Sequence, residues 1–302
     1  MKALITTETS ISLQTVADPV ITDSHQVKIR IHRAALCRTD LYVADGRIPT
    51  ENGRILGHEA AGEIIELGSA VEAFTIGDRV TLDPLQSCRN CPECHENLPH
   101  LCGHTKFMGI HFHGAFAEQV VIPANKVYRI PQDLDFDLAV YAEPIAATRA
   151  VLGALGSTDD DILIYGRGRI SGLTTQILKS AGYHKVTTSM TPPAKQYPVV
   201  IEAIDSAEDL ATVLPYLQSG GLLILKSRHP QDISLPLLDL VQQRIQIKAV
   251  HYSPFREALS YLTENRDFIR TLIGNQWSLE SYQKAFTEAR SSEALKTLFT
   301  LD

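Results

Sequence analysis

The sequence predicts an α/β protein of two domains, a β-rich domain followed by a shortened, doubly wound domain with a parallel sheet. The chain has 302 residues and 44% hydrophobic content, which is enough to bury two sizeable cores. Up to Glu143 the chain reads as short strands and turns. After it, predicted strands and helices alternate, the pattern of a parallel sheet covered by helices.

The first domain shows short apolar stretches bounded by turn residues. Residues 27–31 alternate apolar and polar side chains, which is typical of a half-buried strand. The other stretches begin or end at glycine or proline, residues that commonly bound strands. The predicted strands are Val27–Ile31, Ala60–Leu67, Asp78–Leu82 and Gly114–Pro123.

The second domain opens at Pro144, which suits a first helical turn, and an apolar run with helical spacing follows from Ile145 to Leu155. The remaining elements alternate between buried strands and one amphipathic helix that glycine terminates. They are strand Asp161–Gly166, helix Ile170–Ala181, a strand at Val186, and strands Pro198–Ala203 and Gly221–Lys226. A last strand is expected at Leu295–Leu301, after Trp277, Tyr282 and Phe286.

Four of the 5 cysteines lie close together, at Cys88, Cys91, Cys94 and Cys102. As disulfides they would cross-link only a small loop, and one cysteine of the chain would remain unpaired. In a reducing compartment, closely spaced cysteines more often bind metal. Four thiolates complete a tetrahedral shell around Zn²⁺ and leave no open position, so we predict a structural zinc site.

The fifth cysteine, Cys37, precedes a Gly-His-Glu sequence with His58 and Glu59, and Glu143 follows at the expected domain boundary. A mixed shell of thiolate, imidazole and carboxylate can leave a position for water or substrate, as catalytic zinc sites do. The alternative for Cys37 is a small buried hydrophobic residue. The context of the other ligands favours a catalytic metal site.

Charge and hydropathy exclude other classes of protein. The formal net charge is −7, and the 28 Lys and Arg residues are dispersed, so we expect no nucleic-acid partner. No apolar stretch approaches the length that spans a bilayer, so we expect no membrane association. The N-terminal sequence has no apolar core of a signal peptide, and we expect a cytoplasmic protein.

A glycine-rich turn lies between a predicted strand and helix, with Gly166, Gly168 and, at the third position of the fingerprint, Ser171. Such a turn binds the pyrophosphate of a dinucleotide, although it could also be a turn without a ligand. The acidic residue that holds the ribose should end the next strand, but this position has Ser189 among hydroxyl residues. We expect a shortened Rossmann-type cofactor domain with a slight preference for NADP.

Several motifs together indicate a family: Cys-x-Thr-Asp at 37–40, Gly-His-Glu at 57–59, the four cysteines, Glu143-Pro144, and the closing residues 292–296. They resemble the zinc-containing medium-chain alcohol and polyol dehydrogenases over nearly the whole chain. The resemblance implies a GroES-like catalytic domain formed by residues 1–143 and 271–302. It also implies a Rossmann-like nicotinamide cofactor domain formed by residues 144–270.

The resemblance also implies roles for single residues. Thr39 takes the proton of the substrate alcohol, and Asp40 orients the ring of His58; their ordinary alternatives are a buried threonine hydrogen bond and a turn aspartate. Family members often end the proton relay with a histidine where this chain has Tyr42. Lys296 is expected to assist at the pyrophosphate. The implied catalytic zinc ligands are Cys37, His58, Glu59 and Glu143.

The sequence thus predicts an oxidoreductase that holds two zinc ions and transfers hydride between a small alcohol or polyol, or its carbonyl, and NAD(P). One alternative is a zinc lyase or isomerase on the same scaffold without a dissociable nicotinamide, because the cofactor domain is short. A second alternative is a non-catalytic binding protein. A homo-oligomer, dimer or tetramer, is the family expectation.

Overall fold

The structure is a computed structural model, and it describes residues 1–8, 10–96, 98–204, 207–291 and 295–301. Residues 292–294 of the closing motif therefore lie outside the described residues. Among the helices that are described, none has the length and apolar character needed to cross a membrane.

The chain divides into two compact units. The first comprises Met1–Pro144 and Phe255–Asp302, and the second comprises Ile145–Pro254. The first unit therefore includes residues 255–270, which the division made from the sequence assigned to the second domain. These residues form helices α7 (Phe255–Glu264) and α8 (Arg266–Arg270), and both pack against α3 (Phe136–Ala139) of the first unit.

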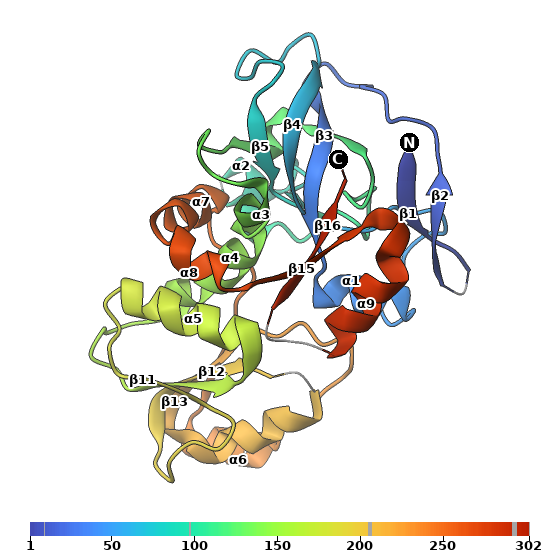
Figure 1. The fold of residues 1–302 in the computed structure, drawn as a ribbon. Helices are drawn as coiled ribbons and strands as arrows, with labels where there is room; N and C mark the ends of the chain where they lie inside the picture. The colour runs from blue at the N-terminus through green and yellow to red at the C-terminus, as the bar shows by residue number, and fades with distance from the viewer. Residues whose placement is uncertain (9, 97, 205–206, 292–294, 302) are drawn as a thin grey trace. The chain divides into compact units, whose positions relative to one another are not determined.

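A seven-stranded sheet is the framework of the first unit. Its strand order is β15-β16-β3-β4-β5-β9, and β8 also pairs with β3. Only the pair β15–β16 is parallel. Figure 1 shows β3, β4 and β5 side by side, with the red strand β16 next to β3. The strands are β3 (Gln26–Ala35), β4 (Glu59–Leu67), β5 (Arg79–Leu82), β8 (Gln119–Pro123), β9 (Val127–Arg129), β15 (Ile273–Ser278) and β16 (Lys296–Thr300).

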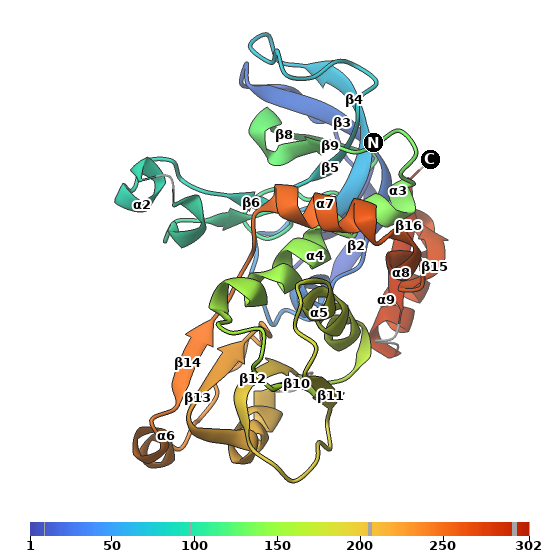
Figure 2. The same cartoon turned by 90° about the vertical axis from the view of Figure 1, so that its left-hand side faces the viewer.

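Smaller elements complete the first unit. A two-stranded hairpin and a second strand pair are separate from the large sheet, and short helices connect them. Figure 2 shows the segment with α2 projecting away from the sheet, beyond β6. The elements are β1 (Lys2–Thr6), β2 (Ile11–Thr15), α1 (Arg38–Ala44), β6 (Leu85–Gln86), α2 (Pro92–His95), η1 (Pro99–Leu101), β7 (Lys106–Phe107), η2 (Ala124–Lys126), η5 (Leu279–Ser281) and α9 (Tyr282–Ser291).

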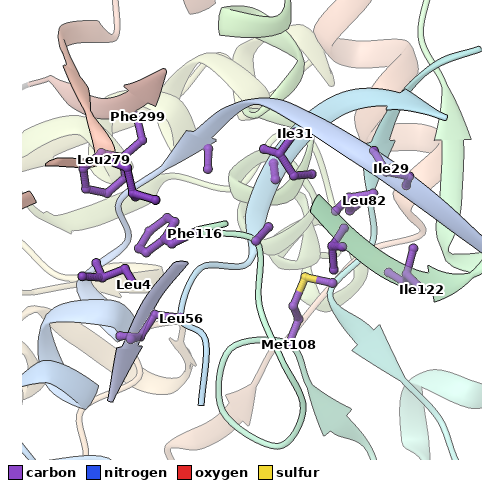
Figure 3. Close-up of a cluster of buried hydrophobic side chains, with 14 of the residues drawn as sticks. Leu4, Ile29, Ile31, Leu56, Leu82, Met108, Phe116, Ile122, Leu279 and Phe299 are labelled. Atoms are coloured by element: carbon purple, nitrogen blue, oxygen red, sulfur yellow. The ribbon is translucent and has the colours of Figure 1, made fainter. Parts of the chain in front are cut away.

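The core of the first unit joins side chains of β3 and β5 with side chains of the N-terminal hairpin. Figure 3 shows Phe116 beside Phe299, and their ring centroids are 5.0 Å apart in an edge-to-face arrangement. Met108 fills the space near Leu82 on β5, and it is fully buried. Aromatic pairs in this geometry stabilise a core beyond the area they bury. The sheet that carries the site is therefore rigidly packed.

The second unit is a five-stranded parallel sheet with strand order β11-β10-β12-β13-β14. The predicted class, an α/β fold with a parallel Rossmann-like sheet beside a GroES-like β domain, is confirmed. Figure 1 shows α5 and α6 on opposite faces of this sheet. The elements are β10 (Ile162–Gly166), α5 (Gly168–Ser180), β11 (Val186–Ser189), β12 (Tyr197–Ala203), η4 (Ala207–Tyr216), β13 (Leu217–Leu225), α6 (Leu237–Gln243) and β14 (Gln246–Ala249).

Two elements differ from the sequence prediction. The strand predicted at Gly114–Pro123 is regular only in β8, because the residues before Gln119 bond irregularly to β1 and the segment before β4. The helix predicted at Ile145–Leu155 begins earlier, as α4 (Ala142–Arg149), and ends as the 3₁₀ helix η3 (Ala150–Ala154). Pro144 fits inside α4 because the first N–H groups of a helix have no intrahelical partner.

Candidate active site

Strand pairing brings the Cys37 and Gly-His-Glu motifs together. Cys37 follows β3 and is the N-cap residue of α1, while Glu59 begins β4. The antiparallel register places Ala35 opposite Glu59. Gly57, just before the motif histidine, has φ of +91°, and a Cβ there would lie 2.3 Å from the ring of Phe116. This glycine therefore allows the chain to turn tightly against the core before it enters β4.

Cys37, His58 and Glu59 each offer a ligand atom, and these atoms lie within 4.8 Å of one another. His58 and Glu59 are each 1% exposed. Nε2 of His58 and Oε2 of Glu59 are buried and have no hydrogen-bond partner. Buried polar atoms are almost always paired, so these orphaned atoms fit a cation between them. Thiolate, imidazole and carboxylate are the donors that zinc takes in catalytic sites.

Asp40 fixes the orientation of this cluster. Its carboxylate accepts hydrogen bonds from the backbone N–H of Cys37 at 2.9 Å and of Gly57 at 3.2 Å. Its Oδ1 also lies 3.4 Å from Nδ1 of His58. A carboxylate on one ring nitrogen of a histidine leaves the other nitrogen for a metal. The geometry supports the orienting role expected for Asp40.

Lys296 is the residue whose place the sequence did not reveal. Its ammonium donates to Oε1 of Glu59 at 2.5 Å, and the two side chains are 2% and 1% exposed. The antiparallel pairing of β16 with β3 carries Lys296 to this position, since Leu36 N–H bonds to Thr297 C=O. The sequence feature that could have indicated this position was a lone lysine in an apolar strand. Its expected contact with a pyrophosphate stays a prediction.

The charges of the cluster shift its ionisation. Burial would raise the pKa of the Cys37 thiol, but the positive charges of His58 and Lys296 outweigh it and lower this pKa to about 6. Burial raises the pKa of the Glu59 carboxyl to about 7, against the opposing charge of Lys296. For His58, burial opposes protonation, but Asp40 and Cys37 raise the pKa well above 6.5. A thiol that ionises near neutral pH is ready to bind a metal ion.

The other expected site residues surround this cluster. The Sγ–H of Cys37 donates to Oγ1 of Thr39 at 3.8 Å, so the threonine hydroxyl lies beside the ligand thiol. Tyr42 is 7% exposed on α1, and the guanidinium of Arg47 lies 4.4 Å from its ring centroid. Glu143 is buried in the first turn of α4, and its charge acts on Cys37. It is not among the three residues whose ligand atoms cluster.

The four remaining cysteines form a second cluster, with all four Sγ atoms within 4.8 Å of one another. Sγ of Cys88 and Sγ of Cys102 are 3.6 Å apart. A regular tetrahedron with Zn–S distances of about 2.3 Å has S···S edges of roughly 3.8 Å, so the Cys88–Cys102 distance is close to that of a zinc site. The backbone N–H of Cys88 lies 3.4 Å from Sγ of Cys102, and such bonds lower the pKa of the Cys102 thiol to about 6.

The glycine turn of the second unit has the geometry of a nucleotide-binding turn. Gly168 has φ of +82°, and it begins α5. A Cβ on Gly166 would lie 2.2 Å from the carbonyl oxygen of Ala203 on the neighbouring strand. Ser171 is 1% exposed and donates to the carbonyl of Arg167 at 3.1 Å, so it packs within the turn as the third glycine would.

Ser189 lies at the carboxyl end of β11 as expected, but its hydroxyl accepts the N–H of Thr191 at 2.9 Å. Folds of this kind bind their ligands at the carboxyl ends of the parallel strands, at the point where the strand order reverses. Here β10 is that point, because β11 and β12 lie on its two sides. The structure therefore brings Gly166 and Gly168 to the ligand-binding edge.

Comparisons with known proteins agree with this fold. The alcohol dehydrogenase GroES-like domain matches residues 23–132. Sorbitol dehydrogenase of Halalkalibacterium halodurans is 27% identical over 341 residues, which cover 99% of each chain. L-threonine 3-dehydrogenase of Salmonella gallinarum is 24% identical over 344 residues, which cover 100% of each chain. A structure from Sinorhizobium meliloti 1021 bound to NADP has a TM-score of 0.87 at 23% identity, covering 99% of this chain and 98% of that chain.

A GroES-like unit with a mixed-ligand cluster and a thiol cluster, joined to a Rossmann-like unit, defines a two-domain dehydrogenase with metal sites. Over its whole length the chain is similar to zinc-containing medium-chain dehydrogenases, and residues 23–132 match their GroES-like domain. The resemblance predicted from the sequence motifs is thereby confirmed.

Proposed function

We propose that this chain is a zinc-dependent dehydrogenase that transfers hydride between a small alcohol or polyol, or its ketone or aldehyde, and NAD(P). The observation that carries the proposal is the buried cluster of Cys37, His58 and Glu59, in which two ligand atoms have no protein partner. The similarity to sorbitol and L-threonine dehydrogenases supports alcohol oxidation by the same scaffold.

The residues of the cluster have separate tasks in this proposal. Cys37 and His58 hold the metal, and Glu59 and Glu143 are carboxylates beside it. Zinc bound there supplies a Lewis acid that lowers the pKa of an alcohol hydroxyl. Thr39, whose hydroxyl lies beside the Cys37 thiol, accepts the alcohol proton and passes it on, and Tyr42 on the same helix is the next candidate in the relay.

The four-cysteine cluster has a structural task. Between Cys88 and Cys102 the described elements are only the one-turn helix α2, which has no buried residue, and the 3₁₀ helix η1, whose Leu101 is 59% exposed. A segment without a core needs another source of folding energy, which a closed thiolate–zinc site provides. We therefore propose a second zinc ion held by Cys88, Cys91, Cys94 and Cys102.

The proposed cofactor contacts are at the turn that precedes α5. Gly166 and Gly168 let the backbone approach a pyrophosphate at the positive end of this thirteen-residue helix, with Ser171 packed beneath them. Arg167 is the exposed N-cap residue of α5, next to Gly168, and the slight preference for NADP, which remains a proposal, depends on this charged group. Lys185 and Lys195 do not support it, because they pair with Asp159 and Asp161 before β10, at the amino edge of the sheet.

Turnover and zinc content together test this function. The wild-type protein should reduce NAD⁺ or NADP⁺ with some member of a panel of polyols, amino alcohols and simple alcohols, measured at 340 nm. Cys37→Ala should lose one zinc ion and turnover but keep its melting temperature, whereas Cys91→Ser should lose the other ion and destabilise its segment. One zinc ion per chain that Cys37→Ala retains would contradict the catalytic assignment. Zinc-dependent activity without nicotinamide would support a lyase or isomerase.

We also propose that the chain forms a homo-oligomer through the outer edge of the second unit. Leu237, Leu238 and Val241 on α6 are 72%, 67% and 66% exposed. Helix α6 packs against β13, the neighbour of β14, which is the edge strand of the five-stranded sheet. An edge strand can pair with its own copy about a two-fold axis, and an apolar face beside it then becomes buried. Light scattering should show that Leu238→Glu dissociates the oligomer, while Ile76→Glu, an equally exposed site on the first unit, should not.

A further inference from the structure

The sheet of the second unit lacks one strand of the complete dinucleotide-binding fold. That fold has the strand order 3-2-1-4-5-6, built from two mononucleotide-binding halves. Here the order is β11-β10-β12-β13-β14, so β11 is strand 2, β10 is strand 1 and β12 is strand 4. Strand 3 has no counterpart among the described residues, and β11 is the edge of the sheet. The missing strand belongs to the half that holds the adenosine.

The segment that replaces strand 3 and its helices is short. Residues 190–196 lead directly from the carboxyl end of β11 to the start of β12. Met190 packs against the core residues on one face of the sheet, and Pro192 is buried. Lys195 donates to Asp161 at 2.5 Å, at the opposite edge. The segment therefore folds back along the sheet and does not form one side of a binding site at the end of β11.

Among the residues that the structure describes, those at the end of β11 offer no carboxylate for the adenosine ribose. The hydroxyls of Thr188 and Thr175 bond to each other at 2.7 Å, and the Ser189 hydroxyl accepts the N–H of Thr191. The chain has no Asp or Glu at all between Asp161 and Glu202. The 2′-OH of the adenosine ribose is normally held by a carboxylate at this position. The residues here do not fit that half of the cofactor.

The pyrophosphate end is intact by contrast. Gly168 has the positive φ of the turn, and Gly166 lies so close to Ala203 that no side chain could stand between them. Glu202, at the end of β12, accepts the N–H groups of Lys226 and Ser227 at 2.6 Å each. These bonds fix the loop after β13 at the same edge. The half of the fold that faces phosphate and nicotinamide is therefore built, while the adenosine half is not.

We infer that this chain recognises a nicotinamide mononucleotide unit with its phosphate and leaves the adenosine of a dinucleotide unbound. The inference rests on the proposed function, because it concerns which part of the nicotinamide cofactor that function uses. It has two consequences. Reduced nicotinamide mononucleotide should bind nearly as tightly as NADH, and the 2′-phosphate that distinguishes NADPH from NADH should have little effect on binding.

Direct binding tests the inference without turnover. Titration calorimetry and dihydronicotinamide fluorescence should give dissociation constants for reduced nicotinamide mononucleotide, NADH and NADPH within about tenfold of one another, and millimolar AMP should not displace any of them. A hundredfold tighter binding of NADH than of the mononucleotide, equal to about 2.7 kcal/mol, would overturn the inference and leave the proposed function standing. Absence of binding by all three ligands would overturn the proposed function and the inference with it.

A variant at the end of β11 gives an independent answer. Thr188→Asp introduces the missing carboxylate at an exposed position. If the adenosine is unbound, the ratio of NADPH to NADH affinity should change less than threefold. A selective loss of NADPH binding of tenfold or more would place the ribose at β11 and overturn the inference. Gly168→Ala is the matched control at the phosphate end, and it should weaken all three ligands by the same factor, with folding checked by circular dichroism.

Discussion

Replacing Lys296 by methionine should destabilise the metal-free protein by about 3–5 kcal/mol at pH 8. The ammonium of Lys296 donates to Glu59 at 2.5 Å, and the two side chains are 2% and 1% exposed. Removing one member of a buried ion pair leaves the other charge without compensation, which costs about 3–5 kcal/mol. The second oxygen of Glu59 already lacks a partner, so no other group of the protein relieves the loss.

The pH dependence of this cost follows from the raised pKa of Glu59, which is about 7 against an ordinary value of 4.5. A carboxyl with a raised pKa in the folded state binds a proton more readily there than in the unfolded chain. Its contribution to stability is present below pH 4.5 and is lost as the pH rises through 7. At pH 5 the carboxyl of Glu59 is mostly neutral, so the loss of Lys296 should cost much less than at pH 8.

Guanidinium unfolding of chelator-treated protein at pH 5 and pH 8 measures both effects. The double variant Lys296→Met, Glu59→Gln should recover much of the stability, because no uncompensated charge remains. Lys2→Met is the control, since its ion pair with Glu280 is on the surface and should leave the stability almost unchanged. A cost at pH 8 below about 1 kcal/mol, or an equal cost at both pH values, would refute the reasoning.

Four further outcomes are expected. Thr39→Val should lower turnover by roughly 10²–10⁴-fold, the range of a positioned proton relay, with unchanged zinc content; near-native turnover would contradict this role. Chelation should expose the segment around Cys91 to proteolysis before the rest of the chain unfolds, and Cys91→Ser should show this without chelator. Gly62→Ala should destabilise by about 1–3 kcal/mol, because its Cβ would lie 2.0 Å from a β3 carbonyl, whereas Gly153→Ala, with open space, should not. The NMR titration of His251 should give a pKa near 4, lowered by burial and then by a neighbouring arginine, so stability should fall as the pH drops from 6.5 toward 4; a pKa of 6.5 would contradict this.

Both clusters of candidate metal ligands could be predicted from the sequence because these ligands are few and chemically distinctive. The spacing of Cys88, Cys91, Cys94 and Cys102 is short, so local chain geometry alone can bring the four thiols together. The pairing of Cys37 with His58 and Glu59 needs only adjacent antiparallel strands. The strand–glycine–helix pattern likewise defines the cofactor turn locally.

The role of Lys296 could not be predicted, because it depends on which strand β16 joins. A lysine 237 positions from Glu59 in the chain reaches it only through the pairing of β16 with β3. The boundary at residue 255 has the same origin. Helices α7 and α8 follow the second unit in sequence but pack against α3, and an amphipathic pattern shows that a helix has an apolar face without showing what covers it.

The sequence by itself determined the family resemblance, the fold class and the ligand types, because each depends on residues close together or on a specific motif. It also revealed that the cofactor domain is short. Only the tertiary structure decided that the shortening removes strand 3, that Lys185 and Lys195 lie at the amino edge, and that Glu59 pairs with a lysine. These are contacts between segments far apart in the chain, and the free energy of such contacts comes from packing and pairing that no local pattern encodes.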